Sequence, residues 1–283
     1  MFETLLTEGV VLAEALAPLQ SSQAELLGRI RNDTLLSASL WVNVALAGLS
    51  VLLFVYMGRN VRSPRAKLIW GATLLIPLVS LSSYLGLLSG LTVGLIEMPL
   101  GHALEGEAVL SQWGRYLTWA LSTPLILLAL GLLADVDIGD LFVVIAADIA
   151  MCLTGLAAAL TTSSYAFRWA FYLVSCSFFV VVLYALLAEW PADAERAGTG
   201  EVFGTLRTLT VVLWLGYPII WAVGVEGFAL VQSVGITSWG YSALDVLAKY
   251  VFAYILLRWV ADNQDTIERV SAGTVDAGTP ADD

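Results

Sequence analysis

The chain is organised by long apolar runs separated by short polar connections. Five of these runs contain no Asp, Glu, Lys or Arg, and they cover residues 35–57, 68–96, 116–134, 169–188 and 208–225. Each run is close to or above the ~18–20 residues that cross ~30 Å of hydrocarbon as a helix. These runs alone therefore predict five membrane-spanning helices.

Two further runs have the same length but carry charged residues inside them. Residues 141–164 contain Asp148, and residues 234–257 contain Asp245 and Lys249. Counted with the other five runs in chain order, they predict an all-α membrane protein with a bundle of seven transmembrane helices.

This pattern divides the chain into three parts. Residues 1–33 form an N-terminal segment, residues 34–262 form the seven-helix domain, and residues 263–283 form an acidic tail. The N-terminal segment lacks the basic start of a secretory signal. Two interpretations of it stay open: a processed leader, or a short helix that lies on the outer surface.

Basic residues are distributed unequally between the two sides of the predicted bundle. Eight lie on one side: Arg59, Arg62, Arg65, Lys67, Arg196, Arg207, Arg258 and Arg269. Three lie on the other: Arg29, Arg31 and Arg168. Because cytoplasmic loops carry the excess of Lys and Arg, we expect a multi-pass protein of the cell membrane. Its N-terminus is predicted to be extracellular and its C-terminus cytoplasmic.

Composition supports a membrane protein and narrows its partners. Of the 283 residues, 59% are hydrophobic and only 13% are charged, whereas soluble domains average about 25% charged residues. Lipid is therefore an expected partner. The net charge of −11 argues against nucleic acid. A single histidine and two cysteines within apolar runs, Cys152 and Cys176, make a metal site improbable.

The charged residues inside the predicted helices need an explanation, because each costs at least ~2.5 kcal/mol at the centre of a bilayer. Asp245 and Lys249 are four residues apart and therefore share one helix face. One interpretation is a structural ion pair. The other is a lysine whose uncharged form is favoured by desolvation, so that it attacks an aldehyde, with Asp245 facing the resulting iminium.

Aromatic residues favour the second interpretation. Trp214, Tyr217 and Trp221 are spaced by three and four residues, so they form one stripe on a helix, and Trp119 lies in another apolar run. Ordinary core packing is the alternative. A flat conjugated ligand clamped between these rings and attached to Lys249 would account for all of them.

Several segments resemble the microbial (type 1) rhodopsins. They are RYLTWALSTP at 115–124, WLGYP at 214–218 and DVLAK at 245–249. The likeness spans residues 35–260 with seven helices in the same order. EMPLGH at 97–102 and LTGLAAALTT at 153–162 are most similar to the halorhodopsins of haloarchaea.

The resemblance implies a chromophore, all-trans retinal, bound to Lys249 as a protonated Schiff base. Trp119 and Trp214 would enclose the polyene, and Tyr217 would orient Asp245. Tyr172 would stand where some relatives have tryptophan. Asp148 would be a protonated, hydrogen-bonded residue near the ring of retinal.

The residues around the predicted Schiff base favour chloride over protons as the transported ion. Proton-pumping members of the family have aspartates at the positions of Thr118 and Ala129. A site with the iminium, Arg115 and Asp245 would carry a net charge of +1, which a bound anion can neutralise. Thr118 and Ser122 are four residues apart and offer hydroxyl donors on one helix face. We therefore predict a light-driven inward chloride pump, an ion transporter rather than an enzyme.

Fewer residues indicate where the anion would leave the protein. Arg207 and Thr210 match halorhodopsin positions associated with anion release, although Arg207 also fits an arginine that reaches to the interface. Glu226 keeps one of the two glutamates that release protons in bacteriorhodopsin, and Thr237 stands in place of the other.

Two alternative functions stay open at this point. A sensory rhodopsin would signal through a membrane transducer, and a secondary transporter would use Asp245 and Lys249 as a coupling pair and would be colourless. The resemblance also implies a homotrimer, with a carotenoid as a candidate partner.

Overall fold

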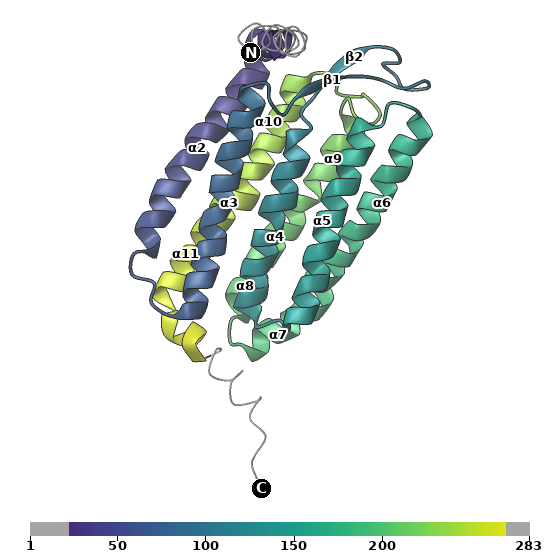
Figure 1. Ribbon diagram of the computed structural model, residues 1–283. Helices are drawn as coiled ribbons and strands as arrows, with labels where there is room; N and C mark the ends of the chain where they lie inside the picture. Colours follow the sequence, from purple (N-terminus) through teal and green to yellow (C-terminus); the bar gives the residue numbers. More distant parts are fainter. Residues whose placement is uncertain (1–22, 270–283) are drawn as a thin grey trace, which may run out of the picture.

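The protein is a bundle of long helices packed side by side. A computed structural model describes residues 23–269, and Figure 1 shows the helices running between two ends of the molecule. The first four spans are α2 (Thr34–Gly58), α3 (Pro64–Leu88), α4 (Gly114–Ala134) and α5 (Ile138–Leu160). Helices α2 and α4 therefore start at one end, and α3 and α5 start at the other. The predicted segment 1–33 and tail 263–283 lie largely outside the described residues, and of these only 23–32 and 264–269 are helical in the part that is described.

The remaining three spans are each interrupted. The fifth is α6 (Tyr165–Tyr184), which continues through the π-helix η1 (Ala185–Glu189) into α7 (Trp190–Arg196). The sixth consists of α8 (Gly200–Trp214) and α9 (Gly216–Val223). The seventh consists of α10 (Val234–Asp245), the π-helix η2 (Val246–Val251) and α11 (Phe252–Asp262). By length and composition, the first six spans are each long and apolar enough to cross a membrane when the interrupted fifth and sixth are counted as Tyr165–Arg196 and Gly200–Val223. The seventh span does not reach this length as one apolar helix among the described residues.

Proline explains one of these interruptions. Pro218 has no backbone N–H, and its ring would clash with the carbonyl of Trp214 four residues earlier. The sixth span therefore breaks at Leu215, between α8 and α9. This break places Trp214 at the end of α8 and Trp221 on α9.

Helix starts follow the expected capping chemistry. The Asp33 carboxylate accepts a hydrogen bond from Leu36 N (2.9 Å) at the start of α2. Ser63 caps α3, where Pro64 occupies the first helical position, and Ser233 caps α10. Such caps satisfy N–H groups that have no partner within the helix.

The connection between α3 and α4 contains a β-hairpin that the sequence pattern did not predict. Strands β1 (Gly94–Glu97) and β2 (Ala108–Ser111) pair antiparallel, with Gly94 opposite Ser111. The predicted span 68–96 was wrong at its end, because α3 stops at Leu88 and Gly90 adopts φ +75°. We call the end of the bundle that carries this hairpin the hairpin end.

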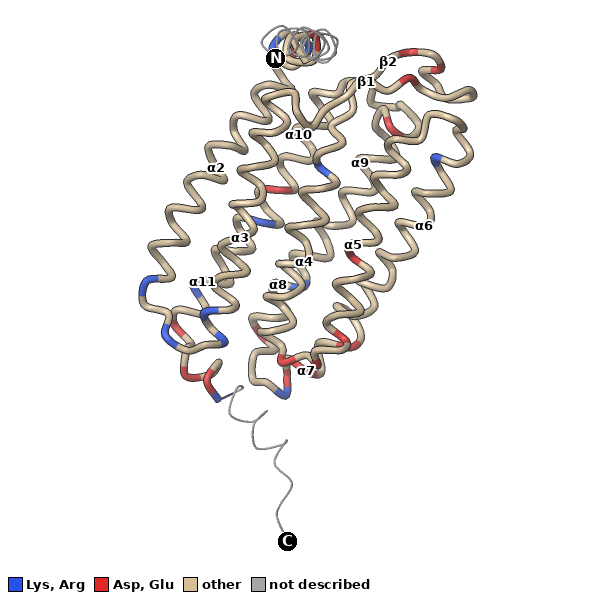
Figure 2. Tube along the Cα trace, viewed as in Figure 1, with Lys and Arg blue, Asp and Glu red and all other residues tan. Residues whose placement is uncertain are grey.

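The outer surface is apolar and the charges lie mainly at the two ends. Leu52, Phe142 and Leu173 are among the large hydrophobic side chains that are more than 60% exposed. Figure 2 shows Lys, Arg, Asp and Glu gathered at the ends of the bundle, with few of them between. This arrangement suits a protein that faces lipid along its sides.

Candidate functional site

Lys249 and Asp245 form a buried ion pair at the centre of the site. Lys249 lies on η2 and Asp245 is the last residue of α10, and each is 1% exposed. Their spacing of four residues puts Nζ in direct contact with Oδ1. The pair that the sequence indicated is therefore formed in the folded chain.

Two phenols hold the Asp245 carboxylate in place. Tyr217 OH donates a hydrogen bond to Oδ1 (2.8 Å), and Tyr84 OH donates one to Oδ2 (2.6 Å). Tyr217 was predicted for this role and Tyr84 was not. Each oxygen of the carboxylate therefore has at least one donor, which favours the ionised form and fixes its orientation.

Arg115 supplies the second buried positive charge. It is 3% exposed at the start of α4. Its Nε donates to Gln112 Oε1 (2.7 Å), its Nη1 to Tyr84 OH (3.0 Å) and its Nη2 to Ser238 Oγ (2.8 Å). The distance from Nη1 to Asp245 Oδ2 is 3.9 Å. Arg115 therefore reaches Asp245 mainly through the Tyr84 hydroxyl.

The two predicted hydroxyl groups of α4 are buried one and two turns deeper than Arg115. Thr118 is 4% exposed, donates to Gly114 O (2.9 Å) and contacts the hydroxyl of Ser83. Ser122 is 0% exposed, and its Oγ has no hydrogen-bond partner among residues 23–269. An unpartnered buried hydroxyl is costly. The Ser122 hydroxyl is therefore a buried donor of α4 that is free to bind a ligand.

The cluster has an unbalanced charge. Lys249 and Arg115 are positive, and Asp245 is the one carboxylate that pairs with them within the described part of the chain. The net charge of these three groups is +1. In a low-dielectric environment such an excess attracts a small anion.

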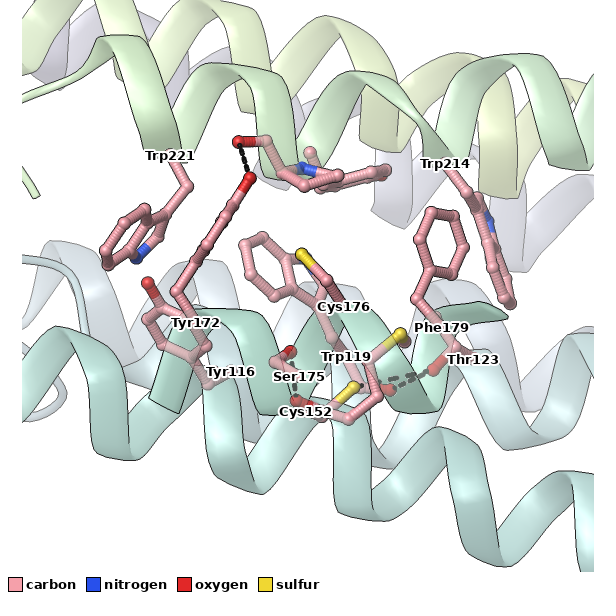
Figure 3. Close-up of a pocket in the computed structure, with 14 residues that line it drawn as sticks. Tyr116, Trp119, Thr123, Cys152, Tyr172, Ser175, Cys176, Phe179, Trp214 and Trp221 are labelled. Carbon is pink, nitrogen blue, oxygen red and sulfur yellow. Dashed lines mark hydrogen bonds between the residues drawn. The ribbon is translucent and has the colours of Figure 1, made fainter. Parts of the chain in front are cut away.

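An aromatic pocket lies beside this cluster. Figure 3 shows Trp214 and Trp221 toward the two ends of the pocket, with Tyr172 and Cys176 between them. The ring centres of Tyr172 and Trp221 are 4.5 Å apart, and the rings are stacked at 19°. The lining residues come from four spans: Tyr116, Trp119, Thr123, Met151, Cys152, Gly155, Tyr172, Ser175, Cys176, Phe179, Trp214, Tyr217, Pro218 and Trp221.

Tyr217 connects the pocket to the charged cluster. Its ring lines the pocket, its hydroxyl donates to Asp245, and Lys249 Nζ lies 5.9 Å from its ring centre. Trp119 also lines the pocket, and the distance between its ring centre and that of Tyr217 is 5.1 Å. The structure thus brings Trp119, Trp214, Tyr217 and Tyr172 together around one apolar space.

Asp148 is buried behind this pocket on α5. It is 0% exposed, and its Oδ2 accepts a hydrogen bond from Thr123 Oγ1 (2.6 Å) on α4. Thr123 lines the pocket. Asp148 therefore joins α4 to α5 next to the apolar space, and its place near the ring of retinal stays a prediction.

The residues predicted for release lie apart from the cluster. Thr210 is fully buried on α8 and donates to Leu206 O (2.9 Å), and Arg207 is half-buried one turn earlier. In the described residues, neither side chain forms a hydrogen bond or ion pair with Arg115, Asp245 or Lys249.

A second, more polar cavity opens toward the hairpin end. Arg115, Gln112, Glu226 and Thr237 are among its lining residues. Glu226 Oε2 accepts a hydrogen bond from Tyr116 OH (2.8 Å). Burial raises the pKa of the Glu226 carboxyl above its ordinary value. Thr237 has a hydroxyl and no carboxyl, and it donates to Val234 O (3.1 Å), so Glu226 has no acidic partner at this position.

Sequence reasoning missed several members of the cluster. Tyr84, Ser83, Gln112 and Ser238 all contact predicted site residues. Tyr84 and Ser83 lie in the apolar run 68–96, where three serines and a tyrosine occur within five residues. Such a polar group inside an apolar helix is the signal that could have identified them.

These features define an integral membrane protein whose helical bundle encloses a lysine–carboxylate pair beside an aromatic pocket. The family model described as bacteriorhodopsin-like protein matches residues 34–263. The chain belongs to this family, as its resemblance to microbial rhodopsins predicted, and it is a multi-pass membrane protein with the seven-helix fold.

Similar proteins include several halorhodopsins. The chain is 73% identical to halorhodopsin of Haloterrigena sp. over 263 residues, which are 92% of this chain and 88% of that protein. It is 66% identical to cruxhalorhodopsin-3 of Haloarcula vallismortis, over 94% of this chain and 96% of that protein. A solved structure described as "Halorhodopsin, a light-driven chloride pump" is 76% identical, has a TM-score of 0.82, and is matched over 83% of this chain and 98% of that one.

Proposed function

We propose that this protein is a light-driven pump that moves chloride into the cell. The observation that carries the proposal is the buried cluster with a net charge of +1, together with the unpartnered buried hydroxyl of Ser122 two turns along α4 from Arg115. A halide requires positive charge and donors, and Arg115, Thr118 and Ser122 provide both. The high identity to halorhodopsins supports the same ion.

The residues around Lys249 fit retinal. The amine is buried, the neighbouring pocket is lined almost entirely by apolar and aromatic side chains, and Trp119 Nε1 makes no hydrogen bond within the described residues. Trp119, Trp214 and Tyr217 would enclose the polyene, and Tyr172 and Asp148 would lie along the pocket. Retinal bound to Lys249 as a protonated Schiff base would supply light absorption and a light-driven change in the direction of its N–H group.

The protein's own residues provide the selection for an anion. Asp245 is held by Tyr84 and Tyr217, so it acts as a fixed counter-charge that does not move to pair with Arg115. Thr118 stands where a carboxylate would neutralise the site and accept a proton. Chloride is proposed to lie near the Arg115, Thr118 and Ser122 donors, since these groups leave the positive charge uncompensated.

The bundle also supports a direction of transport. We place the hairpin end outside the cell, because most Lys and Arg lie at the opposite end. Chloride would enter through the cavity lined by Arg115 and Glu226. It would leave toward Arg207 and Thr210 on α8. A homotrimer, and a carotenoid bound to it, remain predictions from the family resemblance.

A chloride titration of the purified protein with retinal tests this function. Visible absorption is measured while chloride replaces a bulky inert anion at constant ionic strength. We expect a coloured pigment whose spectrum shifts saturably with chloride. A coloured pigment without any chloride dependence would favour the sensory alternative, and a colourless protein would reject retinal binding and favour a secondary transporter.

Transport itself is tested in sealed vesicles. Illumination should drive chloride uptake in vesicles that expose the hairpin end outward, without a pre-existing gradient. Light-driven proton movement that persists after chloride is removed would contradict the proposal.

A further inference from the structure

We infer that Ser238, and through it Ser39, positions the Arg115 guanidinium so that its charge stays available to the anion. The inference rests on the proposed function and adds two positioning residues to the site. Ser238 lies on α10 and Ser39 on α2, and both side chains are 0% exposed. Neither residue carries a charge, and neither lines the aromatic pocket.

A chain of hydrogen bonds connects Arg115 to helix α2. Arg115 Nη2 donates to Ser238 Oγ (2.8 Å), and Ser238 Oγ lies 2.7 Å from Ser39 Oγ. Ser39 Oγ in turn donates to Leu36 O (2.8 Å). The chain therefore ends on a backbone carbonyl in the first turn of α2.

The direction of this chain follows from counting protons. Each serine hydroxyl has one proton to donate. Ser39 uses its proton on Leu36 O, so its oxygen accepts the proton of Ser238. Ser238 then has lone pairs free for the Arg115 N–H. The competing acceptor for the Ser238 proton, Gln112 Oε1, lies farther away at 3.4 Å.

A second series of hydrogen bonds connects Arg115 to Asp245. Its Nη1 donates to Tyr84 OH (3.0 Å), and Tyr84 uses its own proton on Asp245 Oδ2 (2.6 Å). The guanidinium is thus held between a carboxylate, reached through Tyr84, and a backbone carbonyl, reached through the two serines. The resulting separation of Nη1 from Asp245 Oδ2 is 3.9 Å, which is longer than a direct hydrogen bond.

This geometry keeps part of the Arg115 donor capacity free. A guanidinium has five N–H groups, and in residues 23–269 Arg115 uses one from each of Nε, Nη1 and Nη2. Without Ser238, Nη2 loses its partner and only the Nε bond to Gln112 opposes the attraction of Asp245, so the guanidinium can turn toward the carboxylate and form a direct pair. The carboxylate would then neutralise the charge that should attract chloride.

Absorption titration with chloride measures the effect in the full-length pigment. Ser238→Ala should raise the chloride Kd about tenfold, equivalent to about 1.4 kcal/mol. Ser39→Ala should raise it about threefold, since Ser238 can redirect its proton to Gln112 Oε1. Ser50→Ala is the matched control, because Ser50 also lies on α2 but donates only to Leu46 O (2.7 Å). Its chloride Kd should stay within twofold of that of the unmodified protein.

A double-mutant cycle separates positioning from general loosening of the fold. In an Arg115→Lys background, adding Ser238→Ala should change the chloride Kd by less than twofold, because the guanidinium is already gone. Ser238→Thr retains the hydroxyl and should restore most of the affinity. An equally large loss in both backgrounds would show a structural role and overturn the inference.

The outcomes distinguish this inference from the proposed function. If the unmodified pigment shows no chloride shift, the proposed function fails. If it shows the shift but Ser238→Ala binds chloride within twofold of it, only the positioning role fails. Should Ser238→Ala form no pigment, Ser39→Ala carries the test, and a Kd equal to that of Ser50→Ala overturns the inference.

Discussion

Replacing Ser122 by alanine should make the chloride-free protein more stable and the chloride complex weaker. The Ser122 hydroxyl is 0% exposed and lacks a partner in the described residues. A buried hydroxyl without a hydrogen bond costs about 1–3 kcal/mol, and Ser122→Ala removes that cost. At about 2–4 °C per kcal/mol for a domain of this size, the thermal midpoint should rise by at least about 2 °C.

Chloride should reduce this difference in stability or reverse it. A ligand that binds only the folded state stabilises it by about 2.7 kcal/mol at 100 times its Kd. If Ser122→Ala weakens chloride binding about tenfold, the substituted protein loses about 1.4 kcal/mol of this gain. The two unfolding curves should therefore move together or cross as chloride is added.

Ser80→Ala is the matched control for this experiment. Ser80 is also 0% exposed within a helix, but its hydroxyl donates to Ile76 O (3.1 Å). Its removal should not raise the midpoint in chloride-free buffer. Thermal unfolding followed by tryptophan fluorescence, with and without chloride, measures both variants. The reasoning is refuted if Ser122→Ala lowers the chloride-free midpoint as much as Ser80→Ala does.

Three further predictions concern the same region. Tyr84→Phe removes the hydroxyl that joins Arg115 to Asp245, so unfolding free energy should fall by about 1.5–3 kcal/mol in a denaturant titration; an unchanged midpoint would contradict the bridging role. Thr118→Asp brings the cluster from +1 to zero, so the chloride-induced absorption shift should be lost, and a retained shift of native affinity would argue against charge balance as its cause. Because the pKa of Glu226 is raised in the folded protein, folding favours the protonated carboxyl. The stability that Glu226 contributes is therefore fully present below the ordinary pKa of glutamate, and it is lost as pH rises through the raised pKa of the folded state. Glu226→Gln should therefore raise the thermal midpoint at pH 7 and make the midpoint fall less between acidic and neutral pH. Thermal unfolding at a series of pH values measures this. A pH profile equal to that of the unmodified protein would exclude Glu226 as the cause of the decline.

The sequence predicted those features that depend on local pattern. Apolar length gave the number of spans, and a spacing of four residues gave the contact between Asp245 and Lys249. The end of α3 was missed because residues 89–96 are as apolar as the helix before them, while Gly90 and the pairing of β1 with β2 end it. Apolar length does not distinguish an apolar hairpin strand from a helical turn.

Contacts between distant parts of the chain were largely beyond prediction. Ser39 and Ser238 are 199 residues apart, and Tyr84 and Asp245 are 161 apart. No helical spacing relates such positions, since their meeting depends on how α2, α3 and α10 pack. The contact of Tyr217 with Asp245 was anticipated only because the family resemblance supplied the arrangement of the helices.

The π-helix η2 changes the direction in which side chains of the seventh span point after it. A π turn contains one residue more than an α turn, so the side chains after it are rotated by about 100° relative to an uninterrupted helix. Because Lys249 lies within η2, the residues that α11 buries are offset by this rotation from those that α10 buries. Deleting one residue between 246 and 251 would restore a regular helix, and it would turn Phe252, Leu256 and Val260 out of the core that they fill. The additional residue in η2 thus allows the two halves of the seventh span, α10 and α11, to pack against different neighbours.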